Sequence, residues 1–335
     1  MHSSIKTLRI GDLRLASGAD LPDVEIAYVS HGRLNANGDN CVLVTHGLTG
    51  SPAMLLEGPG NAEGSWVDLL RPGAPLDMER YFVVCSNVIG SALGSTGPAC
   101  VNPGSGRPWG AEFPSLTLSD MVAAQHRMLS LLGVHRLKAV VGPSYGGMQA
   151  LQWALDHPAM VEAIGVVVSG LHWPRQLDPD ALVERLRRVA GRCKGLHARD
   201  ATRDEMQKVR VETLQSYGFE ALYLSRDPDP ERCRLAMQRA ANAWAQQFDA
   251  DALVCLQQAG AAFDVRDRIA EIACKVLFVI ATSDRLFPPN AEVRKQLAPL
   301  GERLHYLELD TPYGHLASSP ELPKWAPALH ALLGT

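Results

Sequence analysis

Short runs of β-branched and other apolar residues recur along the chain, separated by segments with the periodicity of amphipathic helices. Several runs are apolar at every position, which is typical of strands buried on both faces of a parallel sheet. The expected strands are Cys41–Thr45, Tyr81–Asn87, Leu137–Val141, Ala163–Ser169, Val276–Ala281 and Leu304–Leu309. The expected helices are Leu118–Leu132, Gly147–Asp156, Ala291–Leu300 and Glu321–Leu333. This alternation predicts an α/β fold with a doubly wound, mostly parallel sheet.

The alternation of strands and helices stops in the middle of the chain. Residues 172–268 are rich in Arg, Asp, Gln and Ala and have helical but no strand periodicity. We therefore predict a helical cap, or lid, over residues 172–268, inserted into a core domain of residues 1–171 and 269–335. Residues 90–114 are rich in Gly, Pro and Ser without periodicity, which predicts a long ordered loop without strands or helices.

The composition of the 335-residue chain is that of a globular protein, with 46% hydrophobic and 20% charged residues. The formal net charge of −4 provides no positive field for phosphate groups, so we expect a small-molecule partner and no nucleic acid. Residues 1–15 lack the continuous apolar stretch of a secretory signal, and apolar runs such as Val276–Ala281 are too short to cross a bilayer. We expect a cytoplasmic protein with no membrane partner.

Cysteine and metal-binding patterns give no sign of a redox or metal centre. The seven cysteines are scattered and include no C-x-x-C pair, so we expect reduced, mostly buried thiols. The chain also contains no H-E-x-x-H motif and no Walker-type phosphate loop. We therefore expect neither a metal ion nor a cofactor.

The strongest local motif is Gly142-Pro143-Ser144-Tyr145-Gly146, which follows an apolar strand and precedes a helical segment. This G-x-S-x-G pattern in a strand-turn-helix context is typical of a nucleophile elbow. The serine of such a turn has a strained backbone, so the residues two before and two after it must be small, as Gly142 and Gly146 are. Glycine-rich turns also join ordinary strands and helices, so the motif needs partners elsewhere in the chain.

A serine hydroxyl becomes a good nucleophile only when a neutral imidazole accepts its proton and a carboxylate orients that imidazole. In the α/β-hydrolase order, the acid follows a later strand and the histidine lies near the carboxyl terminus. Asp284 closely follows the predicted strand Val276–Ala281, and His315 lies just beyond the last predicted strand. We predict a Ser144–Asp284–His315 triad. Asp310 is the competing acid, but it lies on the histidine side of the last strand.

An oxyanion hole for this serine is expected from two backbone N–H groups. The first belongs to Tyr145, directly after the serine. The second lies in the loop His46-Gly47-Leu48-Thr49-Gly50, which follows the strand Cys41–Thr45, and Leu48 is the expected donor. We expect His46 to orient this loop through hydrogen bonds without titrating in catalysis.

Several further segments of the predicted core match the sequence segments of a known family, in the same order along the chain. They are Thr45–Gly50, Cys85–Gly90, Gly94–Pro98, Val101–Pro103, Phe113–Pro114, Asp120–Val122, Gly146–Leu151 and Ser283–Pro289. Together they resemble the homoserine O-acetyltransferase family of α/β-hydrolase-fold enzymes, which includes acyltransferases and esterases. The resemblance implies that fold and a ping-pong reaction: the serine takes an acyl group, usually from acyl-CoA, and passes it to an alcohol or, in esterases, to water. It also implies the same triad and oxyanion roles for the residues named above.

The resemblance further implies contacts for the acyl acceptor. Transferases of the family bind it through an arginine, a tyrosine seven residues later, and an aspartate directly after the catalytic histidine. Arg210 and Tyr217 match the first two, whereas Leu316 stands in place of the aspartate. An ammonium group buried without its carboxylate is unfavourable, which weakens the case for homoserine. The elbow has Pro143 and Tyr145 where the family usually has glycine and methionine, and the Tyr145 ring could narrow the acyl pocket.

Two reactions through the same acyl-enzyme remain open. Hydrolysis of small, acetyl-type esters is favoured, because Leu316 and the altered elbow disfavour an amino-acid acceptor. The alternative is O-acetyl transfer from acyl-CoA, as co-substrate, to homoserine or a similar hydroxyl compound, because Arg210 and Tyr217 are present. A third hypothesis, a non-catalytic receptor for a small apolar ligand, is disfavoured because such proteins commonly lack a triad member. By analogy with the family, a homodimer through the cap is expected.

Overall fold

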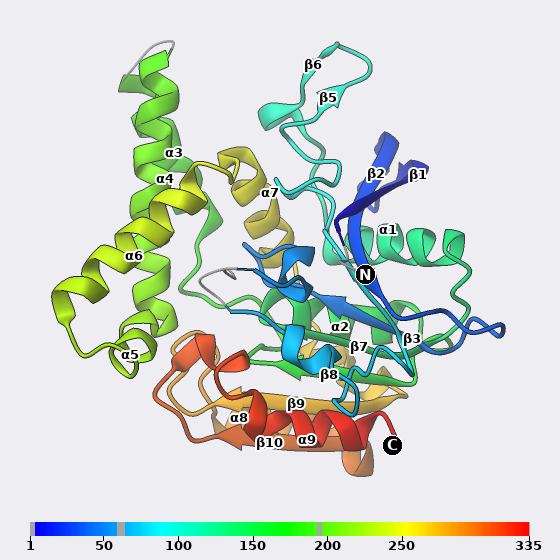
Figure 1. Cartoon of the computed structure of the whole chain (residues 1–335). Coiled ribbons are helices and arrows are strands. Elements are labelled where there is room, and N and C mark those ends of the chain that lie inside the picture. The colour runs from blue at the N-terminus through cyan, green and yellow to red at the C-terminus, as the bar shows by residue number, and fades with distance from the viewer. Residues whose placement is uncertain (1–3, 59–63, 193–195, 335) are drawn as a thin grey trace.

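Within the described residues, the chain forms an eight-stranded sheet covered by helices. The computed structural model describes residues 4–58, 64–192 and 196–334 (Figure 1). In sheet order, the strands are β1 (Lys6–Arg14), β2 (Asp20–His31), β4 (Phe82–Ser86), β3 (Cys41–Thr45), β7 (Leu137–Pro143), β8 (Ala163–Val167), β9 (Lys275–Ala281) and β10 (Leu304–Leu309). Neighbours are parallel from β4 to β10, whereas β1, β2 and β4 pair antiparallel. The sheet is therefore mostly parallel, as the apolar runs predict.

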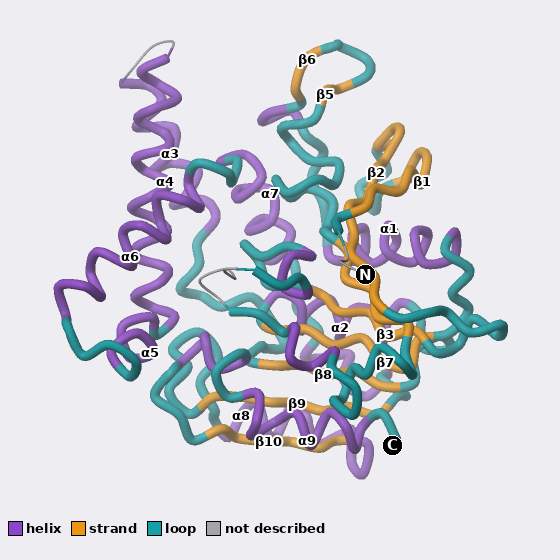
Figure 2. The backbone as a smooth tube through the Cα atoms, viewed as in Figure 1, coloured by secondary structure: helices purple, strands orange, loops and turns teal. Residues whose placement is uncertain are grey.

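Apolar side chains of the parallel strands pack on both faces of the sheet. In β7, Val140 belongs to the hydrophobic core on one face and Val141 to the core on the other, as alternation along a strand requires. The first core includes α1 (Leu118–Leu131) and α2 (Tyr145–Asp156), and the second includes α9 (Leu322–Leu332). Figure 2 shows the strands in orange, with helices on either side of them. This two-sided burial confirms the doubly wound α/β architecture.

Two features of the sheet domain differ from the expectation. The antiparallel pair β1 and β2 is not predicted by the apolar pattern, because charged residues such as Asp23 and Glu25 interrupt β2. α8 (Ala291–Leu297) ends before the expected Leu300, and a short 3₁₀ segment follows it. Pro299 explains the early end, because proline has no N–H group with which to continue the helical hydrogen bonds.

The loop of residues 90–114 contains a short antiparallel pair where no strand was expected. β5 (Val101–Asn102) and β6 (Arg107–Pro108) lie at the tip of a projecting segment (Figure 1). Gly106, with a φ of 67°, supplies the left-handed backbone that this tight reversal needs. Strands of two residues are too short to produce a recognisable periodicity, which is why the expectation was wrong.

Between β8 and β9 the chain leaves the sheet. It forms α3 (Pro179–Arg192), α4 (Leu196–Tyr217), α5 (Phe219–Leu224), α6 (Pro230–Ala245) and α7 (Ala250–Ala261). α4 packs against α3 and α6, and these three helices project from one side of the sheet, whereas α7 lies nearer to the core (Figure 1). The segment is helical, as its periodicity predicts, and the boundaries of a cap domain stay a prediction.

The six cysteines in the described part of the chain are free thiols. Cys100 is exposed, and the buried ones are Cys41, Cys85, Cys233, Cys255 and Cys274. Cys193, also expected to be reduced, lies outside the described residues. In the same described ranges, no helix has both the length and the apolar character needed to cross a membrane.

Two histidine rings stack on one another where α1 meets the end of α2. The ring centroids of His126 and His157 are 4.2 Å apart with an interplanar angle of 12°, and the Trp153 ring lies 5.0 Å from that of His157. Burial lowers the pKa of both imidazoles below the usual histidine value, and His126 lowers the pKa of His157 further. The pair is therefore more stable neutral than protonated.

We expect the free energy of unfolding to decrease as the pH is lowered through about 6.5, the histidine pKa of an unfolded chain. Below this pH the unfolded chain binds protons that the stacked pair resists, so acid favours unfolding. Urea unfolding at about pH 5 and pH 7 measures the difference. The difference in the free energy of unfolding between the two pH values should be smaller in His126→Gln. It should be unchanged in His305→Gln, which replaces an exposed histidine. The same difference in all three proteins would contradict this assignment.

Candidate active site

Ser144 occupies the tight turn between β7 and α2. Its backbone angles, a φ of 54° and a ψ of −121°, lie in a region that residues other than glycine rarely adopt. Surrounding contacts must therefore hold the turn. The Ser144 N–H donates to the Val167 carbonyl at 2.8 Å, and the Ser169 hydroxyl donates to the Ser144 carbonyl at 2.6 Å. The end of β8 and the residues after it therefore hold the serine in place just beyond the C-terminal end of the central strand β7.

The glycines of the motif allow β3 to approach this turn closely. A Cβ atom on Gly146 would lie 2.1 Å from the Thr45 carbonyl oxygen, and one on Gly142 would lie 2.2 Å from the Thr45 hydroxyl oxygen. The Thr45 hydroxyl also donates to the Gly146 carbonyl at 2.8 Å. Thr45 thus supports the elbow, a role that the sequence analysis did not identify. Only its place at the end of a predicted strand could have indicated it.

The three residues of the predicted triad form one hydrogen-bonded chain. Ser144 Oγ lies 2.7 Å from His315 Nε2, and His315 Nδ1 lies 2.9 Å from Asp284 Oδ2. The other carboxylate oxygen of Asp284 accepts the N–H groups of Leu286 and Phe287, at 2.8 and 3.3 Å. With the carboxylate held on both oxygens, Nδ1 carries the proton and Nε2 is free to accept the proton of the serine.

The competing acid Asp310 is not part of this chain. Asp310 is exposed, and its carbonyl accepts a hydrogen bond from the Lys324 ammonium group at 2.8 Å. The side chains of Asp284 and His315 are by contrast 0% and 3% exposed. The structure therefore brings together the three residues that the sequence predicts and leaves Asp310 outside.

Aromatic rings and one short turn position the imidazole of His315. The His315 ring centroid lies 4.5 Å from that of Tyr217 and 5.6 Å from that of Phe287. Gly314, directly before it, has a φ of 54°, and its N–H donates to the Ser283 hydroxyl at 3.0 Å. The imidazole is therefore fixed by packing as well as by its two hydrogen bonds.

The two residues predicted to supply the oxyanion hole, Leu48 and Tyr145, both lie close to Ser144. The Tyr145 N–H is the first of α2, where helical N–H groups have no intrahelical acceptor and the helix dipole favours negative charge. Leu48 lines the same pocket as Ser144. His46 supports the loop of Leu48: its Nε2 accepts the Val88 N–H at 3.3 Å, so Nδ1 carries the proton toward the Gly47 carbonyl, 2.8 Å away. These contacts match the predicted orienting role of His46.

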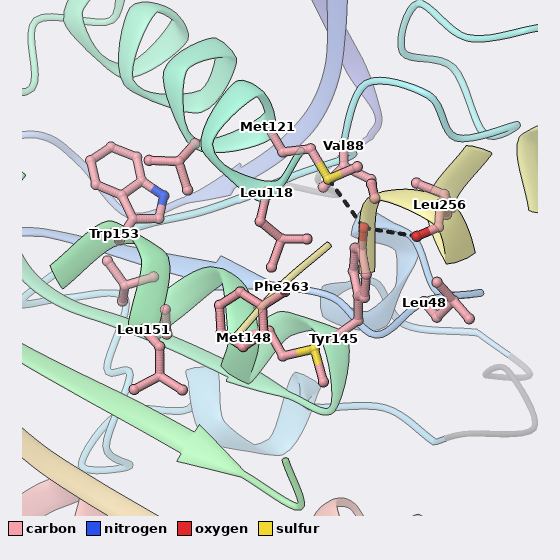
Figure 3. Close-up of a cluster of buried hydrophobic side chains, with 14 of the residues drawn as sticks. Leu48, Val88, Leu118, Met121, Tyr145, Met148, Leu151, Trp153, Leu256 and Phe263 are labelled. Carbon is pink, nitrogen blue, oxygen red and sulfur yellow. Dashed lines mark hydrogen bonds between the residues drawn. The ribbon is translucent and has the colours of Figure 1, made fainter. Parts of the chain in front are cut away.

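The ring of Tyr145 does not narrow the acyl pocket, contrary to the expectation. It is 1% exposed and lies in the hydrophobic core, where its hydroxyl donates to the Leu256 carbonyl of α7 at 3.1 Å (Figure 3). The ring is absent from the lining of the pocket beside Ser144. An acceptor on α7, 111 residues away in sequence, holds the ring there.

The pocket beside Ser144 is small and mostly apolar. Its volume is about 40 Å³, which leaves room for only a few atoms. The pocket is lined by Ser144 and His315 and by apolar side chains that include Leu48, Met54, Trp66, Val168 and Leu316. Among the residues that the structure describes, no three His, Cys, Asp or Glu side chains gather in a way that could hold a metal ion.

The two residues of α4 implied by the family resemblance lie next to this pocket. Tyr217, 4% exposed, lines the pocket together with Ser144. Arg210, 2% exposed, donates to the Thr49 hydroxyl at 2.9 Å, and its guanidinium lies 5.2 Å from the Trp244 ring centroid. Arg210 and Tyr217 also line an adjoining pocket that shares Leu48 and Thr49 with the first. Both residues are thus brought to the site, and their contact with an acceptor stays a proposal.

Comparisons with known proteins identify the family of this chain. The family described as alpha/beta hydrolase fold matches residues 40–320. A homoserine O-acetyltransferase of Moorella thermoacetica is 34% identical, over 96% of this chain and 93% of its own length. One of Rhodopseudomonas palustris (strain BisB18) is 32% identical, over 96% of this chain and 88% of its own length.

Solved structures show the same fold. A homoserine O-acetyltransferase from Bacillus anthracis superposes with a TM-score of 0.86 at 20% identity, over 100% of this chain and 98% of its own. Esterase E22 superposes with a TM-score of 0.84 at 22% identity, over 99% of this chain and 100% of its own. On the strength of the sequence matches, the chain belongs to the homoserine O-acetyltransferase-like family of α/β-hydrolase-fold enzymes.

Proposed function

We propose that this chain is a serine O-acyltransferase, which carries a short acyl group from acyl-CoA, through an ester on Ser144, to a hydroxyl acceptor. The observation that carries the proposal is the hydrogen-bonded chain Ser144–His315–Asp284, with distances of 2.7 and 2.9 Å. The pocket of about 40 Å³ beside the serine supports a short acyl group such as acetyl.

In the first half-reaction, His315 Nε2 accepts the hydroxyl proton while Ser144 Oγ attacks the thioester carbonyl carbon. The N–H groups of Leu48 and Tyr145 stabilise the oxyanion that forms. The carbon–sulfur bond then breaks, and the imidazolium gives its proton to the leaving thiolate. Asp284 stabilises the imidazolium and holds its tautomer, so acyl-Ser144 and the free thiol of CoA are the products.

In the second half-reaction, the acceptor hydroxyl gives its proton to His315 Nε2 and its oxygen attacks the acyl carbonyl carbon. The same two N–H groups stabilise the second oxyanion. The bond to Ser144 Oγ breaks, the serine regains its proton from the imidazolium, and the acylated acceptor leaves. Water in place of the acceptor would give hydrolysis by the same steps.

The curated relatives favour acyl transfer. By contrast, the sequence alone favoured ester hydrolysis because of Leu316 and the altered elbow. The names of these relatives give homoserine as acceptor, and the relatives cover nearly the whole chain at 32 and 34% identity. Arg210 and Tyr217 also support an acceptor site, because both are buried on α4 beside the pocket of the nucleophile. A site built for water alone would need neither residue.

Ester hydrolysis is the second candidate, and one residue favours it. Leu316 is 1% exposed and lines the pocket at the position where the family's transferases carry an aspartate. An apolar side chain offers no charge to an amino group, so homoserine loses a contact there. The acceptor of a transferase with this residue is accordingly expected to lack an ammonium group or to bind it elsewhere.

Partition of the acyl-enzyme between acceptors tests the proposal. Purified protein receives acetyl-CoA with no acceptor, with homoserine, or with 4-hydroxybutyrate, which lacks the amino group, and thiol release is followed. Release that increases with either hydroxyl compound, together with formation of its acetyl ester, supports transfer. Hydrolysis is supported instead if neither hydroxyl compound accelerates thiol release and if the turnover of p-nitrophenyl acetate is the same with and without them. Full activity in Ser144→Ala would contradict both.

Replacing Leu316 by aspartate is expected to raise kcat/KM for homoserine relative to 4-hydroxybutyrate by about 10- to 100-fold, the value of a hydrogen bond to a charged group. The new carboxylate would lie in the pocket lining and pair with the ammonium group. Steady-state kinetics with both acceptors, per titrated active site, measures the ratio. Leu316→Asn is the control of similar size without charge, and an equal gain there would show that the charge is not responsible.

A further inference from the structure

Tyr145 joins two parts of the molecule that are far apart in sequence. Its backbone belongs to the elbow, as the first residue of α2 directly after Ser144. Its side chain crosses the core and donates from the hydroxyl to the Leu256 carbonyl of α7, at 3.1 Å. The residue that directly follows the nucleophile is thus hydrogen-bonded through its side chain to α7, a helix between β8 and β9.

The surroundings leave the ring little freedom. Figure 3 shows Tyr145 standing between α1 and α7, with Met121 on one side of the hydroxyl and Leu256 on the other. The hydroxyl lies 3.5 Å from the Met121 sulfur, and the ring meets the Trp173 ring edge-on with centroids 6.2 Å apart. In a core without gaps, an anchored hydroxyl fixes the whole side chain.

The C-terminal end of α7 and the residues after it contact the segment that follows β8. The Trp173 N–H donates to the Phe263 carbonyl at 3.2 Å, and the Val265 N–H donates to the Leu171 carbonyl at 2.9 Å. Gly260 in α7 lacks a side chain where the Trp173 ring packs, since a Cβ there would lie 2.3 Å from that ring. These contacts hold the C-terminal end of α7, and Leu256 lies about one helical turn before Gly260.

We propose that Tyr145 is a positioning residue: its hydroxyl bond to Leu256 orients its own backbone N–H toward the oxyanion and so makes the oxyanion hole depend on the placement of α7. This inference rests on the proposed acyl-enzyme function and deepens it. The side chain is rigid between its two ends, so a shift of α7 would be transmitted to the N–H group. A misplacement of about 1 Å at a catalytic group can lower the rate about 10²-fold.

Two further observations bear on this tether. Burial raises the pKa of the Tyr145 hydroxyl well above its usual value, so the hydroxyl stays protonated and remains a donor. Methionine, the usual residue of the family at this position, has no proton to donate. The tether is therefore a property of chains with tyrosine here.

Tyr145→Phe tests the tether, because it keeps the ring and removes only the hydrogen bond. The matched control is Tyr306→Phe on β10, whose hydroxyl also makes a 3.1 Å bond, to Glu308, far from the elbow. An organophosphonate titration counts folded, reactive Ser144 in each protein. Three quantities are then measured per active site: kcat and KM for p-nitrophenyl acetate, and the affinity for methylboronic acid, which forms a tetrahedral anion on the serine.

The tether predicts that Tyr145→Phe lowers kcat about 10-fold, less than the 10²- to 10³-fold loss when an oxyanion donor is removed altogether. KM should stay unchanged, and boronate affinity should weaken by the same factor as kcat/KM, because both report oxyanion stabilisation. Unchanged kcat and boronate affinity in Tyr145→Phe, or an equal loss in Tyr306→Phe, would overturn the inference. Failure of the acyl-enzyme proposal looks different: the wild-type protein itself would then show no turnover dependent on Ser144.

Discussion

Replacing Asp284 by asparagine is expected to lower kcat for acyl transfer about 10⁴-fold while the protein stays folded. The carboxylate accepts the Nδ1 proton of His315 at 2.9 Å and therefore leaves Nε2 free to accept the proton of Ser144. An amide at this position can donate to Nδ1, which favours the tautomer with Nε2 protonated. In that tautomer the imidazole cannot act as the base.

Asp310→Asn is the matched control for this change, since it removes the other carboxylate that the sequence offers. It lies on the surface and should leave kcat unchanged. The rates of p-nitrophenyl acetate turnover and of acetyl-CoA consumption are compared across wild type and both variants, with circular dichroism to verify folding. A large loss in Asp310→Asn together with an active Asp284→Asn would reverse the assignment of the acid.

Gly146→Ala is expected to abolish activity and to reduce the free energy of unfolding by about 3 kcal/mol or more, the upper range for overpacking a core. The added methyl group would lie 2.1 Å from the Thr45 carbonyl oxygen, and 2.8 Å from the carbonyl carbon. Both atoms belong to the backbone at the end of β3, so neither can rotate away. Either β3 or the elbow must move, and both carry groups of the site.

The matched control is Gly191→Ala in α3, where an added Cβ meets nothing within 4 Å. This change should leave activity intact and stabilise the protein by up to about 1 kcal/mol, because alanine favours helix more than glycine does. Urea unfolding measures both effects, and active-site titration measures the reactive fraction. A fully active and stable Gly146→Ala would show that the elbow does not depend on this close approach.

The apolar pattern was sufficient to predict the six parallel strands, because five of them are largely buried and rich in apolar residues, and only β10, at the edge of the sheet, is mostly half-buried. The same pattern missed β1 and β2, since Asp23 and Glu25 give β2 a mixed face. Helix ends depended on single residues, as Pro299 shows after α8. Patterns within one segment therefore predicted the central strands better than the outer strands β1 and β2 and the ends of helices.

The hydrogen-bonded chain of Ser144, His315 and Asp284 was predictable because its members occur in a fixed order, each after a strand. Contacts between distant segments were not predictable in this way. Thr45 supports the elbow from β3, and the rotamer of Tyr145 depends on Leu256, 111 residues further along. Arg210 and Tyr217 could be associated with the site only through the family resemblance, since their own segment shows nothing but helical periodicity.

Direct detection of the acyl-enzyme tests the central claim that Ser144 carries the acyl group. The protein is mixed with p-nitrophenyl acetate or acetyl-CoA, quenched in acid within the first turnovers, digested and analysed by mass spectrometry. We predict one acetyl group on the peptide that contains Ser144, its absence in Ser144→Ala, and its loss on addition of an acceptor. An acetyl group confined to another residue, or turnover by Ser144→Ala at the wild-type rate, would contradict the account.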